Sequence, residues 1–155
     1  MEKTDRIMKN IDVENRLIDF IHTHSDGLGL YWVPLVKLKK SVPVVSFNLD
    51  AIYRNNDVIA LEKVFRECGI SNVNTFQMNN REYFQNMSIV DLLYEKDDDG
   101  YNFPWNVETF YFDSSEEWLV YVSHEGTISF TGRRITETAT KSIDNAYNTN
   151  PRLLE

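Results

Sequence analysis

The last third of the chain constrains the fold most, because short polar connections separate three apolar runs there. The runs VETFYFD, EWLVYVSH and TISFTG cover residues 107–113, 117–124 and 127–132. Each is rich in β-branched and aromatic residues, which favour strands. Connections this short join antiparallel neighbours, so the pattern predicts a three-stranded antiparallel meander.

The middle run of the meander carries apolar side chains on both faces. Side chains alternate between the two faces of a strand. Trp118 and Val120 therefore share one face, and Tyr121 lies on the other. A strand that is apolar on both faces is expected to be covered on both, which predicts a central position in the sheet.

Three segments before the meander have the apolar spacing of amphipathic helices. They cover residues 5–24, 57–68 and 89–96. Asn56 and Ser88 directly precede the second and the third helix, and we expect them to be the N-caps.

The second expected helix has a clear end, and a fourth helix is expected near the end of the chain. Gly69 follows the second helix and is expected to end it. A fourth helix is expected over residues 136–147. The residues expected to face the sheet from this region are Ile135, Ala139, Ile143 and Ala146.

Three more segments have the composition of strands. Residues 30–38 and 42–49 are expected to pair as a hairpin, and residues 73–78 to form a short strand. Pro34 and Pro43 cannot donate a hydrogen bond to a neighbouring strand, so the hairpin is expected at a sheet edge or beside a bulge.

These elements together predict an α+β fold: a mostly antiparallel sheet with a C-terminal three-strand meander, flanked by three to four helices. Without repeats or a Pro-, Gly- or Ser-rich linker, residues 1–155 are expected to form a single domain. No apolar run approaches the ~20 residues of a membrane span, and no signal peptide is recognisable. The lone cysteine, Cys68, excludes an internal disulfide and is expected to be a small apolar residue near a helix end. We therefore expect a cytoplasmic protein.

The acidic residues are concentrated in one part of the chain. The 35 residues from Asp91 to Glu125 contain ten acids and one base, while the other 120 contain 14 acids and 15 bases. A local negative field repels nucleic acid and attracts basic partners. We expect a basic protein partner, and neither nucleic acid nor a membrane.

Aromatic residues are interleaved with these carboxylates. Binding hot spots combine Trp and Tyr anchors with charges that steer the encounter. The residues expected at the partner surface are Asp97, Asp98, Asp99, Tyr101, Trp105, Asp113, Glu116, Glu117, His124 and Glu125. The alternative interpretation is that the aromatic rings are core and the carboxylates form a solvated face.

Ser123, His124 and Glu125 are adjacent, but they do not have the arrangement of a catalytic triad. In a strand, Ser123 and Glu125 share one face and His124 lies on the other, so His124 cannot accept the proton of Ser123. The run also lacks the glycines of a nucleophile elbow. No catalytic residue is expected. The chain is expected to turn here, with Gly126 in the turn.

Neither a metal nor a cofactor is expected. If Asp97 opened an EF-hand loop, the sixth position would be Asn102, where such loops need glycine. The run of Asp residues before Gly100 is more typical of a solvated turn. His22 and His24 stand two residues apart on a helix and point in different directions.

The run W-x-x-Y-x-S-H-E from Trp118 to Glu125, in a small acidic α+β chain, supports one family resemblance. The chain resembles uncharacterised intracellular proteins of Gram-positive bacteria and the immunity proteins encoded beside secreted polymorphic toxins. Immunity proteins bind and block a cognate toxin, often a basic nuclease. The resemblance implies a non-catalytic inhibitor, and it transfers no individual site residue.

Two other functions stay open from the residues alone. One is a small ligand-binding or regulatory domain with a pocket between the sheet and the first two helices. The other is a hydrolase that uses His124 with Glu125 or Glu108. An apolar cavity would favour the former, and a cleft holding His124 beside a second ionisable group would favour the latter.

Overall fold

The computed structural model describes most of the chain beyond residue 42. The described residues are Asn15, 43–77, 82–94, 96–97, 100–101, 109–115, 117–123 and 126–149. For residues 96–97 and 100–101 the description covers the backbone alone. The helix expected over residues 5–24 (Asn15 apart) and the strand expected over 30–38 lie outside the described residues.

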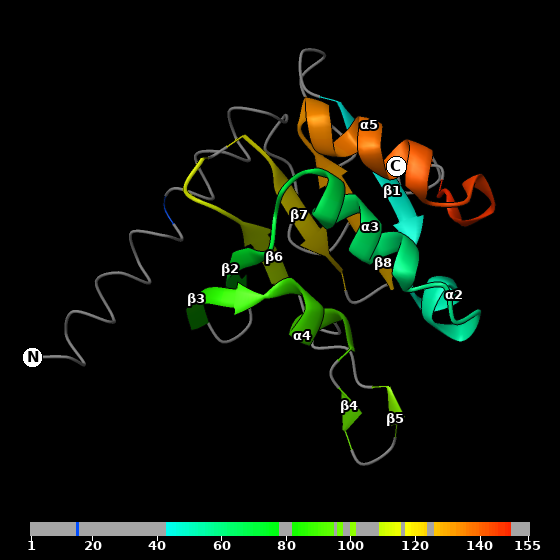
Figure 1. The fold of residues 1–155 in the computed structure, drawn as a ribbon, viewed down its shortest axis with the longest axis horizontal. Helices are drawn as coiled ribbons and strands as arrows, with labels where there is room; N and C mark the ends of the chain where they lie inside the picture. The colour runs from blue at the N-terminus through cyan, green and yellow to red at the C-terminus, as the bar shows by residue number, and fades with distance from the viewer. Residues whose placement is uncertain are drawn as a thin grey trace, which may run out of the picture.

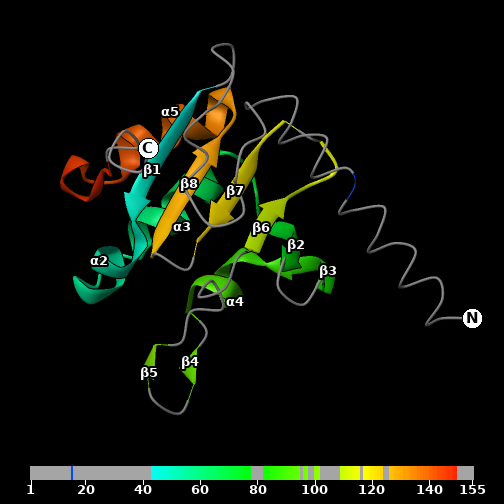
Figure 2. The same cartoon turned by 180° about the vertical axis from the view of Figure 1, so that it is seen from behind.

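Six antiparallel strands form one sheet (Figures 1 and 2). They are β1 (Val44–Asn48), β2 (Asn72–Gln77), β3 (Glu82–Ser88), β6 (Thr109–Phe112), β7 (Leu119–Val122) and β8 (Thr127–Thr131). Their spatial order is β1-β8-β7-β6-β2-β3. Both the α+β class and the antiparallel meander β6-β7-β8 are confirmed.

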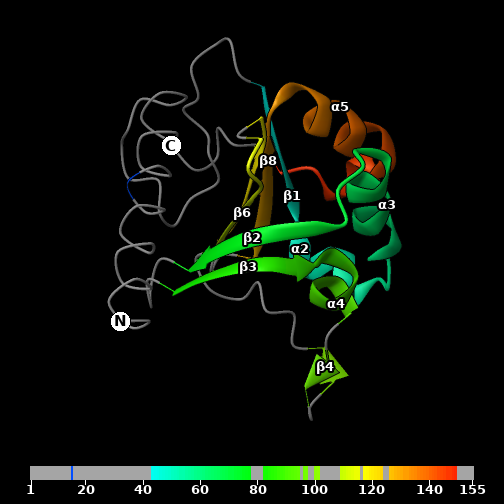
Figure 3. The ribbon, with the colours of Figure 1, turned by 60° about the vertical axis from the view of Figure 1, so that its left-hand side comes forward.

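Four helices accompany the sheet in the described part of the chain. They are α2 (Leu49–Arg54), α3 (Ile59–Glu67), α4 (Ile89–Tyr94) and α5 (Arg133–Ser142). Figure 3 shows α3 and α5 side by side on one face of the sheet. A separate two-stranded hairpin, β4 (Lys96–Asp97) with β5 (Gly100–Tyr101), follows α4.

The main core lies between the sheet and these helices. Phe65 of α3 is fully buried and contacts two rings of the sheet, with ring centroids 6.2 Å from those of both Trp118 and Phe130. Each large apolar side chain removed from water in this way contributes about 1.5–3 kcal/mol. Rings contributed by α3, β8 and the start of β7 therefore hold the helical layer on the sheet.

The central position predicted for residues 118–123 is confirmed. β7 is third in the strand order, and all four of its residues are buried. Val120 belongs to the core under the helices, whereas Tyr121 lies on the opposite face, 4.7 Å between centroids from the ring of Phe110. Strand β7 is thus apolar and buried on both faces.

The ends of α2 and α3 share one geometry, which corrects the role expected for Asn56. After α2, Asn56 has φ +59°, and the amides of Asn56 and Asp57 donate to the carbonyl oxygens of Tyr53 and Ile52. This is a Schellman motif, so Asn56 ends α2 and does not cap α3. Helix α3 begins at Ile59 without a side-chain cap.

Gly69 ends α3 in the same way, as expected. Its φ is +71°, and the amides of Gly69 and Ile70 donate to the carbonyl oxygens of Arg66 and Phe65. Cys68 is the half-buried residue at this helix end, in agreement with its expected role. Ser88 caps α4, since its Oγ accepts the Asp91 amide at 3.4 Å.

The last helix differs from the expected one at both ends. It begins at Arg133 and stops at Ser142, because Ile143 adopts an extended backbone. Asp144 then caps a separate 3₁₀ turn (Asn145–Tyr147) by accepting the Ala146 amide at 2.9 Å. Ile135, Ala139 and Ile143 are buried as expected. Ala146 is exposed, so its expected orientation toward the sheet was wrong.

Helix α2, strand β3 and the β4–β5 hairpin were not predicted from the sequence. Helix α2 begins at Leu49, where a strand was expected to end, because Asn48 Oδ1 accepts the Ala51 amide at 3.0 Å and caps a new helix. Strand β3 is largely exposed at one end of the sheet and lacks an apolar alternation. Strand β1, which follows Pro43, is the first strand of the described sheet, and the edge position expected for the hairpin stays a prediction because its other strand lies outside the described residues.

Glycine is required at residue 132, and this requirement can be tested by unfolding. Gly132 has φ +120°, and an added Cβ would lie 2.6 Å from the Glu117 carbonyl oxygen. We expect Gly132→Ala to lower the free energy of unfolding by about 3 kcal/mol or more, from backbone strain and the clash together. Gly69→Ala is the matched control, because Gly69 has positive φ but open space, and should cost about 1 kcal/mol. Equal losses in urea titrations of the two variants would contradict this account.

Tyr111 gives the fold a predictable response to alkali. Burial raises the pKa of its hydroxyl well above the usual value of about 10, and a hydrogen bond with Thr109 offsets only part of this. The unfolded chain then loses this proton before the folded protein does. The contribution of the protonated Tyr111 hydroxyl to the free energy of unfolding is fully present below about pH 10 and is lost as pH rises further, toward the folded pKa. Between about pH 9 and about pH 11, the free energy of unfolding measured with urea should fall more steeply for wild type than for Tyr111→Phe. Parallel declines in the two proteins would contradict this prediction.

Candidate functional site

The connection between β6 and β7 is built on the carboxylate of Asp113. One oxygen accepts the Ser115 amide at 2.9 Å and also the Ser115 hydroxyl, and the other accepts the Trp118 indole N–H at 2.9 Å. The Ser115 hydroxyl in turn accepts the Glu117 amide at 3.2 Å. Asp113 therefore shapes the connection and gives the indole nitrogen of Trp118, which is only 7% exposed, its acceptor.

Two arginines lie beside this acidic connection. Arg133 and Arg134 open α5, directly after Gly132, which packs against the backbone of Glu117 and Trp118. Arg134 donates from its guanidinium to the Glu67 carbonyl oxygen at 3.1 Å, which ties the start of α5 to the end of α3. Tertiary structure thus brings positive charge to a turn that is acidic in the sequence.

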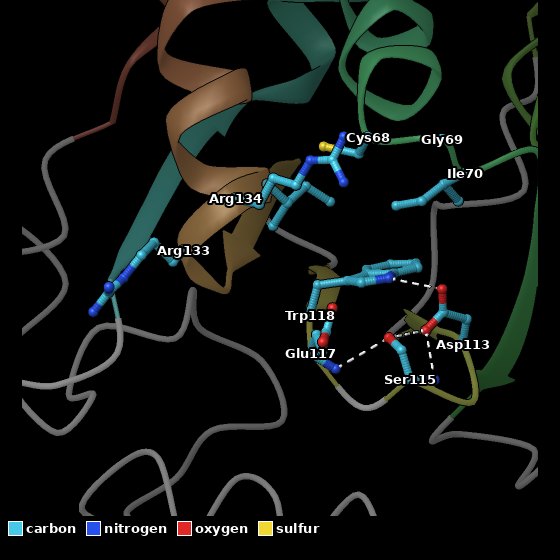
Figure 4. A pocket seen from close by; sticks show the side chains of 10 residues that line it. Cys68, Gly69, Ile70, Asp113, Ser115, Glu117, Trp118, Arg133 and Arg134 are labelled. Carbon is cyan, nitrogen blue, oxygen red and sulfur yellow. Dashed lines mark hydrogen bonds between the residues drawn. The ribbon is translucent and has the colours of Figure 1, made fainter.

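A cavity of about 340 Å³ lies where these elements meet. Its lining comes from the end of α3, the β6–β7 connection and the start of α5. The lining residues are Cys68, Gly69, Ile70, Asp113, Ser115, Glu117, Trp118, Arg133, Arg134 and Ile135. Figure 4 shows Arg134, Cys68 and Ile70 on one side, across from Trp118 and Asp113. The pocket expected between the sheet and the first two helices stays a prediction, since the first of these helices lies outside the described residues.

The turn after β7 has the form expected for residues 123–126. The Ser123 amide donates to the Thr127 carbonyl oxygen and the Gly126 amide to the Ser123 carbonyl oxygen, both at 3.1 Å, and Gly126 has φ +79°. The Ser123 hydroxyl is buried and bonds with the Thr127 hydroxyl at 2.8 Å. The Gly126 carbonyl oxygen accepts the Leu49 amide at 2.8 Å, so the turn abuts the start of α2.

Exposed apolar side chains gather around α4. The exposed large hydrophobic residues of the described chain are Ile59 of α3, Phe84 of β3, and Val90 and Tyr94 of α4. Helix α4 contacts both of the other two elements, α3 and β3. The Tyr94 hydroxyl donates to Glu62 of α3 at 2.7 Å, which joins the exposed edges of the two helices. We call Ile59, Phe84, Val90 and Tyr94 the α4 surface.

The residues expected at a partner surface fall into two groups. Asp97 and Tyr101 belong to the β4–β5 hairpin next to α4, whereas Asp113 and Glu117 belong to the β6–β7 connection. Figures 1 and 2 place the two segments at opposite ends of the fold. The remaining expected residues lie outside the described chain: Asp98, Asp99, Trp105, Glu116, His124 and Glu125.

Sequence reasoning missed both the arginines and the α4 surface. Arg133 and Arg134 are 16 or more residues from Glu117 in the chain, and their proximity follows from the pairing of β7 with β8. The exposure of Val90 and Tyr94 had no clear signal in the sequence, since Val90 lies three residues before the buried Leu93 and so neighbours it on the short helix.

Neither a metal centre nor a membrane-spanning helix is found among the described residues. Within them, no group of three His, Cys, Asp or Glu side chains is placed to hold a metal ion. None of their helices combines the length and the hydropathy needed to cross a membrane.

Comparisons with protein-family models, with curated proteins and with solved structures found no match to this chain.

Two substitutions distinguish the effect of the hydrogen bonds of Asp113 from the effect of its negative charge. Asp113→Ala removes the acceptor of a buried indole N–H and of two Ser115 donors, so we expect a loss of about 2 kcal/mol in the free energy of unfolding. Glu117→Ala removes the same charge from an exposed side chain nearby and should cost less than about 0.5 kcal/mol. The measurement is urea unfolding followed by tryptophan fluorescence. Similar losses in the free energy of unfolding of the two variants would show that the loss of a negative charge, rather than of hydrogen bonds, causes the destabilisation.

Proposed function

We propose that this protein is a non-catalytic binding protein that acts in the cytoplasm and neutralises a basic protein partner, as an immunity protein neutralises its toxin. The observation that carries the proposal is the position of the α4 surface. Of the four exposed large apolar side chains of the described residues, two stand on α4 and the others on α3 and β3, which contact α4, and the acidic β4–β5 hairpin follows α4 in the chain.

The apolar part of this surface supports protein binding. Ile59 is 62% exposed and Val90 49% exposed, although both stand on helices whose other faces are core. Exposed apolar groups that cluster, rather than occurring singly, are typical of interaction sites. Tyr94 adds an aromatic ring with a polar end, the kind of anchor enriched in binding hot spots.

The charges around the α4 surface support a basic partner. Asp91 and Glu62 stand beside the apolar side chains, and Asp97 begins the acidic run that follows. A carboxylate rim around an apolar centre steers a basic protein to the surface and leaves the apolar contact to determine the dissociation rate. The β6–β7 connection supports this function less well, because Asp113 is engaged within its own turn and two arginines lie nearby.

Affinity capture followed by a binding measurement tests the proposal. The tagged protein is used to capture partners from its source organism, and the recovered partner is purified and assayed for toxicity with and without this protein. We expect a partner of isoelectric point above about 9, whose association slows steeply with salt and whose toxic activity is lost in the complex.

Two surface variants provide the specificity control. Ile59→Ser with Val90→Ser should weaken binding at least about tenfold without loss of stability, because both side chains are already exposed. Glu137→Ser with Lys141→Ser changes two exposed residues of α5, which α3 separates from α4, and should bind as wild type. Recovery of no basic protein, or binding indifferent to the first pair and to charge reversal at Asp97, Asp98 and Asp99, would refute the proposal.

A further inference from the structure

The cavity beside Trp118 has two properties of a binding site that are independent of the α4 surface. Its volume of about 340 Å³ is at the low end of the range for small-molecule pockets, which suits a ligand the size of one amino acid. Its walls combine apolar side chains, Ile70, Trp118 and Ile135, with charged groups. Pockets of this kind bind the body of a ligand through the apolar walls and orient it through the few polar groups.

The lining includes charged groups of both signs. Asp113 and Glu117 are negative, and Arg133 and Arg134 are positive. Among the described residues, none of the four forms an ion pair; in particular, no bridge of 4.0 Å or less joins Arg134 to Asp113. Separated, unpaired charges of both signs favour a ligand that carries both signs itself, because a purely anionic or cationic ligand would meet one unfavourable charge.

Each of the two facing charges keeps hydrogen-bonding capacity. Arg134 uses one guanidinium N–H for the Glu67 carbonyl oxygen, which positions the group and leaves its other N–H donors available. Asp113 accepts three hydrogen bonds within its turn, whereas a carboxylate can accept about four. Figure 4 shows the two side chains on opposite sides of the cavity, with Ile70 on the side of Arg134 and the Trp118 indole on the side of Asp113, while Arg133 is directed away.

We propose that this cavity binds a small zwitterion of the α-amino-acid type, with its carboxylate on Arg134, its ammonium group toward Asp113 and its apolar side chain against Trp118 and Ile70. A planar guanidinium matches a carboxylate through paired N–H donors, which makes Arg134 the group that selects the ligand. The site lies at the opposite end of the fold from the α4 surface and would operate whether or not that surface binds a protein.

Three probes of the same apolar body test the proposal on the wild-type protein. They are L-phenylalanine, 3-phenylpropanoate, which lacks the ammonium group, and 2-phenylethylamine, which lacks the carboxylate. Isothermal titration should give L-phenylalanine a dissociation constant below about 1 mM, and each of the others one at least about tenfold higher. The Trp118 indole N–H signal in NMR spectra, identified by its loss in Trp118→Phe, should shift on addition of L-phenylalanine alone at low concentration.

Variants of the two adjacent arginines locate the site. Arg134→Gln should weaken L-phenylalanine binding at least about tenfold, and Arg134→Lys should weaken it less, because the charge remains while the paired donors are lost. Arg133→Gln is the matched control, since this side chain is directed away from the cavity, and it should bind as wild type. The proposal is overturned if no probe binds wild type below about 1 mM, if either single-charge analogue binds as tightly as L-phenylalanine, or if the Arg133 and Arg134 variants are equally affected.

Discussion

The burial of β7 on both faces is the constraint on which the rest of the structure depends. Val120 and Val122 pack beneath α3 and α5, while Leu119 and Tyr121 are buried on the other side of the sheet. A strand with no solvated face cannot stand at an edge, so β6 and β8 must pair with it from either side. The two connections that leave β7 then define the two ends of the fold, with the Asp113 turn at one end and the Ser123–Gly126 turn at the other.

The two proposed functions depend on what is placed at those two ends. At one end, α4 and the start of α3 expose apolar side chains beside an acidic hairpin, an arrangement suited to a protein partner. At the other end, Arg134 is brought across from Asp113 over a cavity with apolar walls, an arrangement suited to a small ligand. The two sites are separated by the length of α3. A protein inhibitor whose far end also binds a metabolite-sized zwitterion is consistent with both.

The fold was more predictable than the site, and particular residues show why. Strands β6, β7 and β8 carry local signals, since alternation and short polar turns are properties of adjacent residues. Helix α2 was missed because Asn48 can follow a strand or cap a helix, and Leu49 is apolar in either case. Asn56 was assigned to the wrong helix because a left-handed asparagine at a helix end and an N-cap asparagine look alike in sequence. Strand β3 has little apolar alternation, because none of its residues is buried at this end of the described sheet.

Local patterns in the sequence predict the class of the fold, the central position of β7 and the end of α3 at Gly69, and they locate the acidic residues between Asp91 and Glu125. Each of these depends on spacing or composition within a short stretch of chain. Which charged side chains lie close together depends instead on how distant segments of the chain pack. Strand pairing and helix packing bring Arg133 and Arg134 to the acidic β6–β7 connection and separate that connection from the β4–β5 hairpin. Electrostatic fields depend on distance in space, and the antiparallel order β1-β8-β7-β6-β2-β3 sets those distances.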